Sequence, residues 1–389
     1  MVTMTLPTTT AKELLARLVA FDTESAKSNI PLIRFVEEYL AGHGIDSQRV
    51  PTPDGEKASL FCSIGPSDRP GLALSGHTDV VPVAGQSWDS DPFTLTERDG
   101  RLYGRGSCDM KGYLACALAM VPQFKQRRLK MPIHLAFSYD EEVGCTGVRP
   151  MIAELGKRLP LPRLVFVGEP TEMGVVDAHK GPVRWRVELR GRAAHSSMPH
   201  YGVNAIAYAN RLLGELLRLE ADLKAAPQDL RFDPPWTTLQ ITQIEGGTAS
   251  NVVPVPCWFG WEVRALPGFD PMQLDRHLKA FAAEHCLPEM RRTAPEAEIR
   301  IAATNRVAAY AADVGSGIVP LSLKLAGQNK TYAVSYCTEA GLFQEGGAPA
   351  IVCGPGNIAQ AHTANEFLDV AELEKCLAFL DRLAAWAEA

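Results

Sequence analysis

Four short apolar stretches of the chain each lead to a side chain that can bind a metal ion. The stretches and the residues that follow them are Gly71–Ser75 with His77, Ile133–Tyr139 with Asp140-Glu141-Glu142, Leu164–Val167 with Glu169, and Pro349–Val352 with His362 ten residues later. In an open α/β sheet, ligands bind beyond the carboxyl ends of the strands. Side chains from separate strands can therefore converge there, and together these four predict a metal centre in an α/β fold.

Length and composition narrow the class of protein. A chain of 389 residues exceeds the size at which one hydrophobic core usually stops growing, so we expect two domains. The net charge of −6 and the lack of a Lys/Arg run give no indication of a nucleic-acid surface. The chain also has no run of 18 apolar residues, so we do not expect a membrane span. The first thirty residues lack the pattern of a signal peptide, and nine scattered cysteines without a CxxC pair indicate reduced thiols. We therefore expect a cytoplasmic protein.

The character of the predicted strands changes along the chain. From Leu60 to Val167, β-rich apolar runs alternate with helical segments, which is typical of a mostly parallel sheet flanked by helices. Val183–Leu189 and Thr237–Ile244 instead alternate apolar and polar residues, which indicates antiparallel strands with one exposed face. We expect residues 182–303 to form an inserted, ferredoxin-like α+β unit of β-α-β-β-α-β order. Residues 1–181 and 304–389 would then form one discontinuous domain.

Each candidate ligand also has an ordinary structural explanation. His77 could be a loop histidine, with Asp79 a helix cap, or it could bind a metal with Asp79 holding its second ring nitrogen. Asp109 stands in a glycine-rich segment before an apolar helix, so it could be a cap or a carboxylate that bridges two cations. Glu141 and Glu142 could be solvated surface acids. Because adjacent residues point in different directions, one of them could instead bind metal while the other faces the substrate.

Together the candidates supply two histidines and three or four carboxylates. Mixed nitrogen and oxygen ligands suit zinc, with cobalt or manganese possible. This is more acid than one zinc ion needs, which favours two ions about 3.5–4 Å apart that share a carboxylate. Such a centre suits hydrolysis of an amide, in which a carboxylate that binds no metal accepts a proton from water. His195, in the inserted unit, could stabilise the oxyanion or could be an ordinary loop histidine.

Six segments resemble the motifs of the acetylornithine deacetylase / succinyl-diaminopimelate desuccinylase / carboxypeptidase family of co-catalytic metallohydrolases. The segments are SGHTDVVP (75–82), GRGSCDMKG (104–112), SYDEEVGCTG (138–147), GEPT (168–171), GRAAHS (191–196) and CGPGNIAQAHTANEF (353–367). The resemblance extends over almost the whole chain. It implies a metallopeptidase-like catalytic domain with an inserted lid domain.

The resemblance also implies a role for each candidate residue. His77 and Glu169 would bind one of two zinc ions, Glu142 and His362 the other, and Asp109 would bridge them, with cobalt possible in place of zinc. Glu141 would be the general base and Asp79 the partner of His77. The lid would form a homodimer in which His195 reaches the partner's active site. The residues that would contact the substrate carboxylate are Asn251 and Arg264, with Gly247 in the preceding turn.

The implied substrate is a small N-acyl amino acid. GSCDMKG, YDEEVGCTGV, His179-Lys180-Gly181 and TEAGLFQ (338–344) are most similar to the deacetylase branch, which implies removal of the acetyl group from N2-acetyl-L-ornithine in arginine biosynthesis. Desuccinylation of succinyl-diaminopimelate, or a broader aminoacylase or dipeptidase activity, would use the same metals. A binding protein without catalysis would show a broken ligand set. One departure, Thr363-Ala364-Asn365 in place of a Pro-acidic pair before Glu-Phe, concerns the rim of the site.

Overall fold

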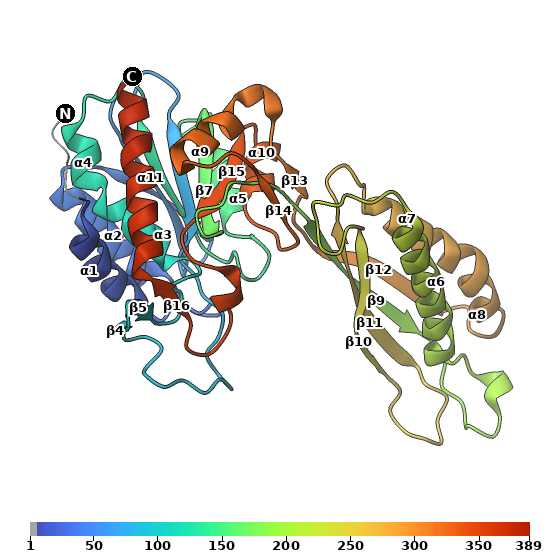
Figure 1. Cartoon of the computed structure of the whole chain (residues 1–389). Helices are drawn as coiled ribbons and strands as arrows, with labels where there is room; N and C mark the ends of the chain where they lie inside the picture. The colour runs from blue at the N-terminus through green and yellow to red at the C-terminus, as the bar shows by residue number, and fades with distance from the viewer. Residues whose placement is uncertain (1–5) are drawn as a thin grey trace. The chain divides into compact units, whose positions relative to one another are not determined.

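The computed structural model describes residues 6–389, which form two compact units (Figure 1). The first unit comprises the chain up to Asp177, Tyr310–Tyr332 and Thr338–Ala389. The second unit comprises Ala178–Ala309 and Ala333–Cys337. The chain therefore leaves the first unit and later returns to it.

A mixed sheet forms the centre of the first unit. Within residues 6–389 it has nine strands, and four adjacent strands in its middle, the third to the sixth in the order given next, run parallel to one another. In spatial order the strands are β1 (Ser47–Pro51), β2 (Ala58–Ile64), β6 (Ile133–Ser138), β3 (Leu72–His77), β7 (Leu164–Pro170), β15 (Ala350–Gly354), β8 (Val176–His179) and β13 (Tyr310–Ala311), with β14 (Tyr332–Val334) beside β8. A small sheet joins β16 (Phe367–Asp369), β5 (Arg101–Tyr103) and β4 (Thr96–Arg98).

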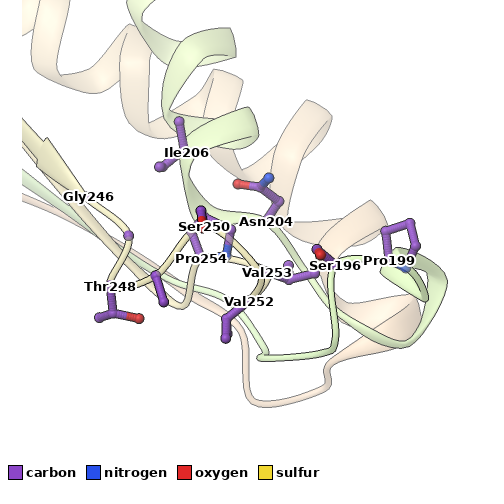
Figure 2. Close-up of a pocket in the computed structure, with 12 residues that line it drawn as sticks. Ser196, Pro199, Asn204, Ile206, Gly246, Thr248, Ser250, Val252, Val253 and Pro254 are labelled. Carbon is purple, nitrogen blue, oxygen red and sulfur yellow. The ribbon is translucent and has the colours of Figure 1, made fainter.

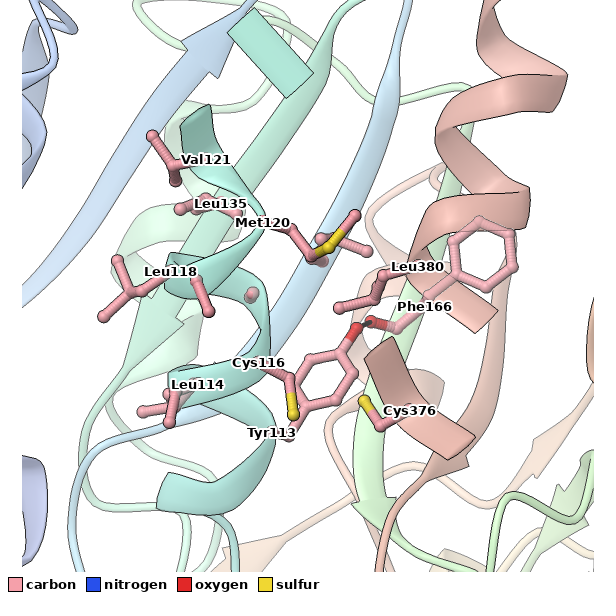
Figure 3. Close-up of a cluster of buried hydrophobic side chains, with 14 of the residues drawn as sticks. Tyr113, Leu114, Cys116, Leu118, Met120, Val121, Leu135, Phe166, Cys376 and Leu380 are labelled. Atoms are coloured by element: carbon pink, nitrogen blue, oxygen red, sulfur yellow. Dashed lines mark hydrogen bonds between the residues drawn. The ribbon is translucent and has the colours of Figure 1, made fainter. Parts of the chain in front are cut away.

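Helices cover both faces of this sheet. The main core lies on the face that carries α1 (Thr8–Val19), α2 (Ile30–Gly42), α3 (Lys111–Ala119), α4 (Val121–Gln126), α9 (Ile318–Ala326) and α11 (Val370–Glu388). Leu72 and Leu74 of β3 point into it, so Ala73 and Ser75 face the other side. Figure 3 shows part of this core, where the Tyr113 hydroxyl donates to the carbonyl of Phe166 over 3.2 Å. The opposite face carries α5 (Val148–Glu154) and α10 (Ala340–Glu345).

The second unit contains a separate antiparallel sheet. Its strand order is β10 (Thr238–Gly246), β11 (Pro256–Ala265), β9 (Gly181–Arg190) and β12 (Glu298–Arg306). One face packs on α6 (Ala205–Ala225), α7 (Met272–Phe281) and α8 (Leu287–Thr293), and there Trp185 and Trp261 stack with ring centroids 4.0 Å apart. The predicted fold class, a mostly parallel sheet flanked by helices with a separate α+β unit, is confirmed. Among residues 6–389, none of the helices is both long and apolar enough to cross a bilayer.

Candidate metal centre

The candidate ligands of the first unit lie at one edge of its sheet. His77 is the last residue of β3, Glu169 lies near the end of β7, and Glu142 follows the end of β6. Ligand atoms of His77, Asp109 and Glu142 lie within 4.8 Å of one another, and so do those of His77, Glu141 and Glu169. The structure therefore brings together side chains that are far apart in the sequence.

Asp109 lies between the two imidazole rings. Its Oδ1 is 3.0 Å from Nε2 of His77, and its Oδ2 is 3.3 Å from Nε2 of His362. The same nitrogen of His362 is 2.9 Å from Oε2 of Glu142, and Nε2 of His77 is 3.7 Å from Oε1 of Glu169. Each oxygen of one carboxylate thus faces a different histidine, and each histidine has a second carboxylate beside it.

The electrostatics of the cluster show an excess of buried acid. Burial, and next the charge of Asp109, raise the pKa of Glu142 to about 7 and that of Glu169 well above its ordinary value. Hydrogen bonds to Asp109 and Glu142 raise the pKa of His362 to about 10. Burial alone would favour neutral His77, yet its bonds to Asp109 and Asp79 raise its pKa as well. Without a cation, the cluster therefore holds protons.

The donor atoms present fit divalent cations. Oε1 of Glu169 is buried without a hydrogen-bond partner among residues 6–389, a costly state for a carboxylate oxygen unless a cation or a proton compensates it. Two imidazole nitrogens with carboxylate oxygens form the mixed donor set that zinc prefers. A bound cation would also replace the protons that the cluster otherwise retains. The residues therefore suit a metal centre in both burial and chemistry.

Asp79 connects His77 to the segment that carries the paired glutamates. The ring Nδ1 of His77 bonds to the Asp79 carbonyl over 2.9 Å, while the Asp79 carboxylate is 3.5 Å away. That carboxylate accepts hydrogen bonds from the Ser25 hydroxyl over 2.7 Å and from the backbone N–H groups of Glu141 and Glu142 over 3.1 and 3.3 Å. Asp79 thus connects the loop that follows β3 with the loop that follows β6.

The side chains of Glu141 and Glu142 point to different partners. Glu142 faces His362, whereas Oε1 of Glu141 accepts a hydrogen bond from the thiol of Cys145 over 3.1 Å. Cys145 has a left-handed backbone with φ of 54° and is buried. The adjacent acids therefore have distinct surroundings.

Sequence reasoning missed two buried carboxylates near these ligands. Glu366 accepts from the backbone N–H of Asp109 over 3.0 Å, and Glu339 accepts from the hydroxyls of Ser138 and Ser75 over 2.5 and 3.3 Å. Burial raises the pKa of Glu339 to about 7. Glu339 directly precedes α10, and its place in the TEAGLFQ segment is the sequence feature that could have pointed to it. Glu366 lies in the segment that follows His362.

The remaining candidates belong to the second unit. The backbone of exposed His195 forms a β-bridge with Val252, and its Nδ1 lies 2.7 Å from Oγ of Ser197. Exposed Asn251 accepts at its carbonyl from the N–H of Ser196 over 3.0 Å. These two residues are therefore neighbours in space.

Gly247 and Arg264 lie elsewhere in that unit. Gly247 has a φ of 78°, which glycine tolerates, and it lines a pocket of about 610 Å³ formed by the 246–254 loop and the start of α6 (Figure 2). Arg264 stands on β11, where its Nε donates to Glu262 over 2.9 Å. This contact is the one expected of a charge on a strand surface.

Comparison with known proteins places these observations in a family. The model of the peptidase family M20/M25/M40 matches residues 73–386. An acetylornithine deacetylase of Myxococcus xanthus is 39% identical over 377 residues, which are 95% of this chain and 96% of that protein. An acetylornithine deacetylase of Proteus mirabilis is 34% identical and covers 91% of this chain and 89% of its own length. The crystal structure of aminopeptidase PepT from Bacillus cereus superposes with a TM-score of 0.76 at 18% identity, covering 98% and 99% of the two chains.

Proposed function

Because this chain belongs to the peptidase family M20/M25/M40 and is therefore a metallohydrolase, we propose that it removes the acetyl group from N2-acetyl-L-ornithine. The products would be L-ornithine and acetate. The observation that supports the chemistry is the cluster in which the two oxygens of Asp109 each face a different histidine. The acyl specificity is supported by the relatives that are acetylornithine deacetylases and align over nearly their full length.

In this proposal the metal centre would hold two zinc ions per subunit, with cobalt possible. His77 and Glu169 would bind one ion, Glu142 and His362 the other, and Asp109 would contact both. When bound, such ions lower the pKa of water to about 7 and polarise a carbonyl group. The chain's own contribution is to hold the acids and imidazoles in place, through Asp79 on one side and Glu366 on the other.

Glu141 is the proposed general base. Its carboxylate would accept a proton from the attacking water as the water oxygen adds to the acetyl carbonyl carbon. It would then give that proton to the amine nitrogen as the carbon–nitrogen bond breaks, so that ornithine leaves with its amino group restored. The thiol of Cys145 fixes one oxygen of this carboxylate, and the bond from the Glu141 N–H to Asp79 fixes its backbone.

The second unit is the proposed lid. In this proposal residues 182–303 form the lid and dimerisation domain, and residues 1–181 and 304–389 form the catalytic domain of a cytoplasmic homodimer. His195 would stabilise the developing oxyanion, in its own subunit or in the partner's site. Asn251 and Arg264 would bind the substrate carboxylate, with Gly247 shaping the turn before Asn251. An arginine fork suits a carboxylate, although Arg264 would have to exchange its contact with Glu262.

A substrate panel on protein of measured metal content tests this proposal. The panel would compare N2-acetyl-ornithine with its formyl analogue, other N-acetyl amino acids, N-succinyl-diaminopimelate and unmodified dipeptides. We expect the highest kcat/KM for acetylornithine. A desuccinylase, a general aminoacylase or a dipeptidase would each show a different best substrate. Turnover of acetylornithine that is orders of magnitude below that of another panel member would reject the substrate assignment but retain the hydrolase.

A further inference from the structure

Glu366 is the centre of a buried hydrogen-bond network that the proposed reaction does not use. Its side chain is 1% exposed, and one oxygen accepts from the backbone N–H groups of Cys108 and Asp109 over 2.9 and 3.0 Å. The other oxygen accepts from the N–H of Gly106 over 2.9 Å and from Nη1 of Arg105 over 2.8 Å. A carboxylate with four donors fixes the loop that carries Asp109, because each bond to a buried charge is strong.

The same network reaches the backbone of His362. Nη2 of Arg105 donates to Oε1 of Gln86, and Nε2 of Gln86 donates to the carbonyl of His362 over 2.8 Å. Trp88 supports this link, since its indole N–H donates to the same Gln86 oxygen over 3.2 Å and its ring lies beside Arg105. The path therefore runs from the Asp109 amide through Glu366, Arg105 and Gln86 to His362.

His362 needs such support more than the other candidate ligands do. Its side chain is 52% exposed, whereas those of the ligands that it faces are at most 7% exposed, so it has little packing to hold it. Its backbone is left-handed, with φ of 62°, a conformation that costs energy for a residue with a side chain. Asn365 adds a second attachment, because its side-chain amide forms hydrogen bonds to the backbone and carboxylate of Asp89 over 2.9 and 3.1 Å.

We propose that Glu366, Arg105 and Gln86 are positioning residues that set the distance between Asp109 and His362. This inference rests on the proposed metal centre and deepens it. Glu366 acts on Asp109, which both ions would share, so its loss should weaken the binding of both. Gln86 acts on His362 alone, so its loss should weaken the binding of only one.

Two conservative variants separate these effects. Glu366→Gln keeps the size of the side chain but places an amide N–H group among N–H donors. Gln86→Glu keeps an acceptor for Arg105 and Trp88 but removes the N–H that reaches the His362 carbonyl. Metal-free protein would be titrated with Zn²⁺ against a competing chelator to obtain the two dissociation constants. The melting temperature of each variant would be measured as well, and both quantities would be compared with those of wild type. We expect both constants to rise by about 10–100-fold in Glu366→Gln, and only one to rise by that factor in Gln86→Glu.

Arg127→Gln is the matched control. Arg127 pairs with Asp381 and Glu388 of α11 in the same unit, and none of these residues is a proposed ligand. This control should lower the melting temperature without changing either zinc constant. Variants at Glu366 and Gln86 that behave as the control does, or that bind both ions as wild type does, would overturn this inference alone. A wild-type protein that binds no divalent cation would overturn the proposed metal centre together with it.

Discussion

Replacing Asp79 with alanine tests whether one carboxylate organises the two loops that supply His77 and the paired glutamates. The change removes a buried acceptor that is 2% exposed and receives three hydrogen bonds, from Ser25 and from the amides of Glu141 and Glu142. The bond from His77 to the Asp79 carbonyl would remain, because it uses the backbone. The loss should therefore fall mainly on the position of Glu141 and Glu142.

The size of the effect follows from these contacts. A hydrogen bond to a charged group contributes about 1.5–3 kcal/mol. Taken as whole residues, Glu141 and Glu142 are only partly buried, although the Glu142 side chain is 7% exposed, so we expect water to replace part of what their amides lose. We expect the free energy of unfolding of the metal-free protein to fall by about 2–4 kcal/mol, below the sum of three such bonds. Zinc affinity and kcat/KM should each fall by about 10–100-fold, as expected when a residue that supports a ligand is removed.

Ser25→Ala is the control for this measurement. It removes one donor to the Asp79 carboxylate but leaves the carboxylate and both amide bonds in place, so we expect a loss of about 1.5–3 kcal/mol in stability. Its zinc affinity and kcat/KM should match wild type. Chemical denaturation would give the stabilities, and a chelator-competition titration would give the affinities. Equal zinc constants and equal kcat/KM in the two variants would refute the view that Asp79 positions the glutamates.

Three further predictions concern other parts of the first unit. Glu141→Gln should retain its metal ions, measured by elemental analysis, while turnover falls by the 10²–10⁴-fold or so that loss of a general base costs; near-normal turnover would remove Glu141 from that role. Metal-free protein should lose stability as the pH rises from about 4.5 to about 7, because the raised pKa of Glu142 means that the folded state binds more protons than the unfolded state. Urea unfolding at pH 5 and 7 would measure this slope, and Glu142→Gln should reduce it, because the raised pKa values of Glu339 and Glu169 contribute to it as well. Asn365→Ala should lower the free energy of unfolding by about 1–2 kcal/mol, because alanine tolerates a φ of 57° less well than asparagine and makes no hydrogen bonds to Asp89. Asn365→Gly should lose only the contribution of the hydrogen bonds to Asp89, because glycine tolerates this backbone conformation; chemical denaturation of both variants would measure the difference.

The strands that lead to ligand residues could be located in the sequence because they depend on local patterns. Buried strands are short apolar runs, and the residue that follows each one marks the sheet edge where ligands gather. The sequence therefore predicts that His77, Glu142 and Glu169 lie at one edge of the sheet. It could also separate the two units, since the strands of the second unit alternate polar and apolar residues while those of the first do not.

The support around the ligands could not be predicted in the same way. Glu366 binds backbone N–H groups more than 250 residues away, and an amide N–H has no signature in a sequence because every residue except proline carries one. Glu339 likewise bonds to serines on β3 and β6, which are ordinary residues in a strand. The proposed roles of His195 and Arg264 are a different case, because the contact of His195 with Ser197 and that of Arg264 with Glu262 do not point to one function.

The departure at 363–365 shows how the structure can give a local sequence change a physical meaning. Asn365 has a left-handed backbone, which asparagine tolerates better than most residues. Its amide uses both of its ends, because Oδ1 accepts from the N–H of Asp89 and Nδ2 donates to the Asp89 carboxylate. An aspartate at this position could accept the first bond but would face the Asp89 carboxylate with a like charge. The amide therefore suits this loop, and it joins the segment after His362 to the same 86–89 loop from which Gln86 donates to the His362 carbonyl.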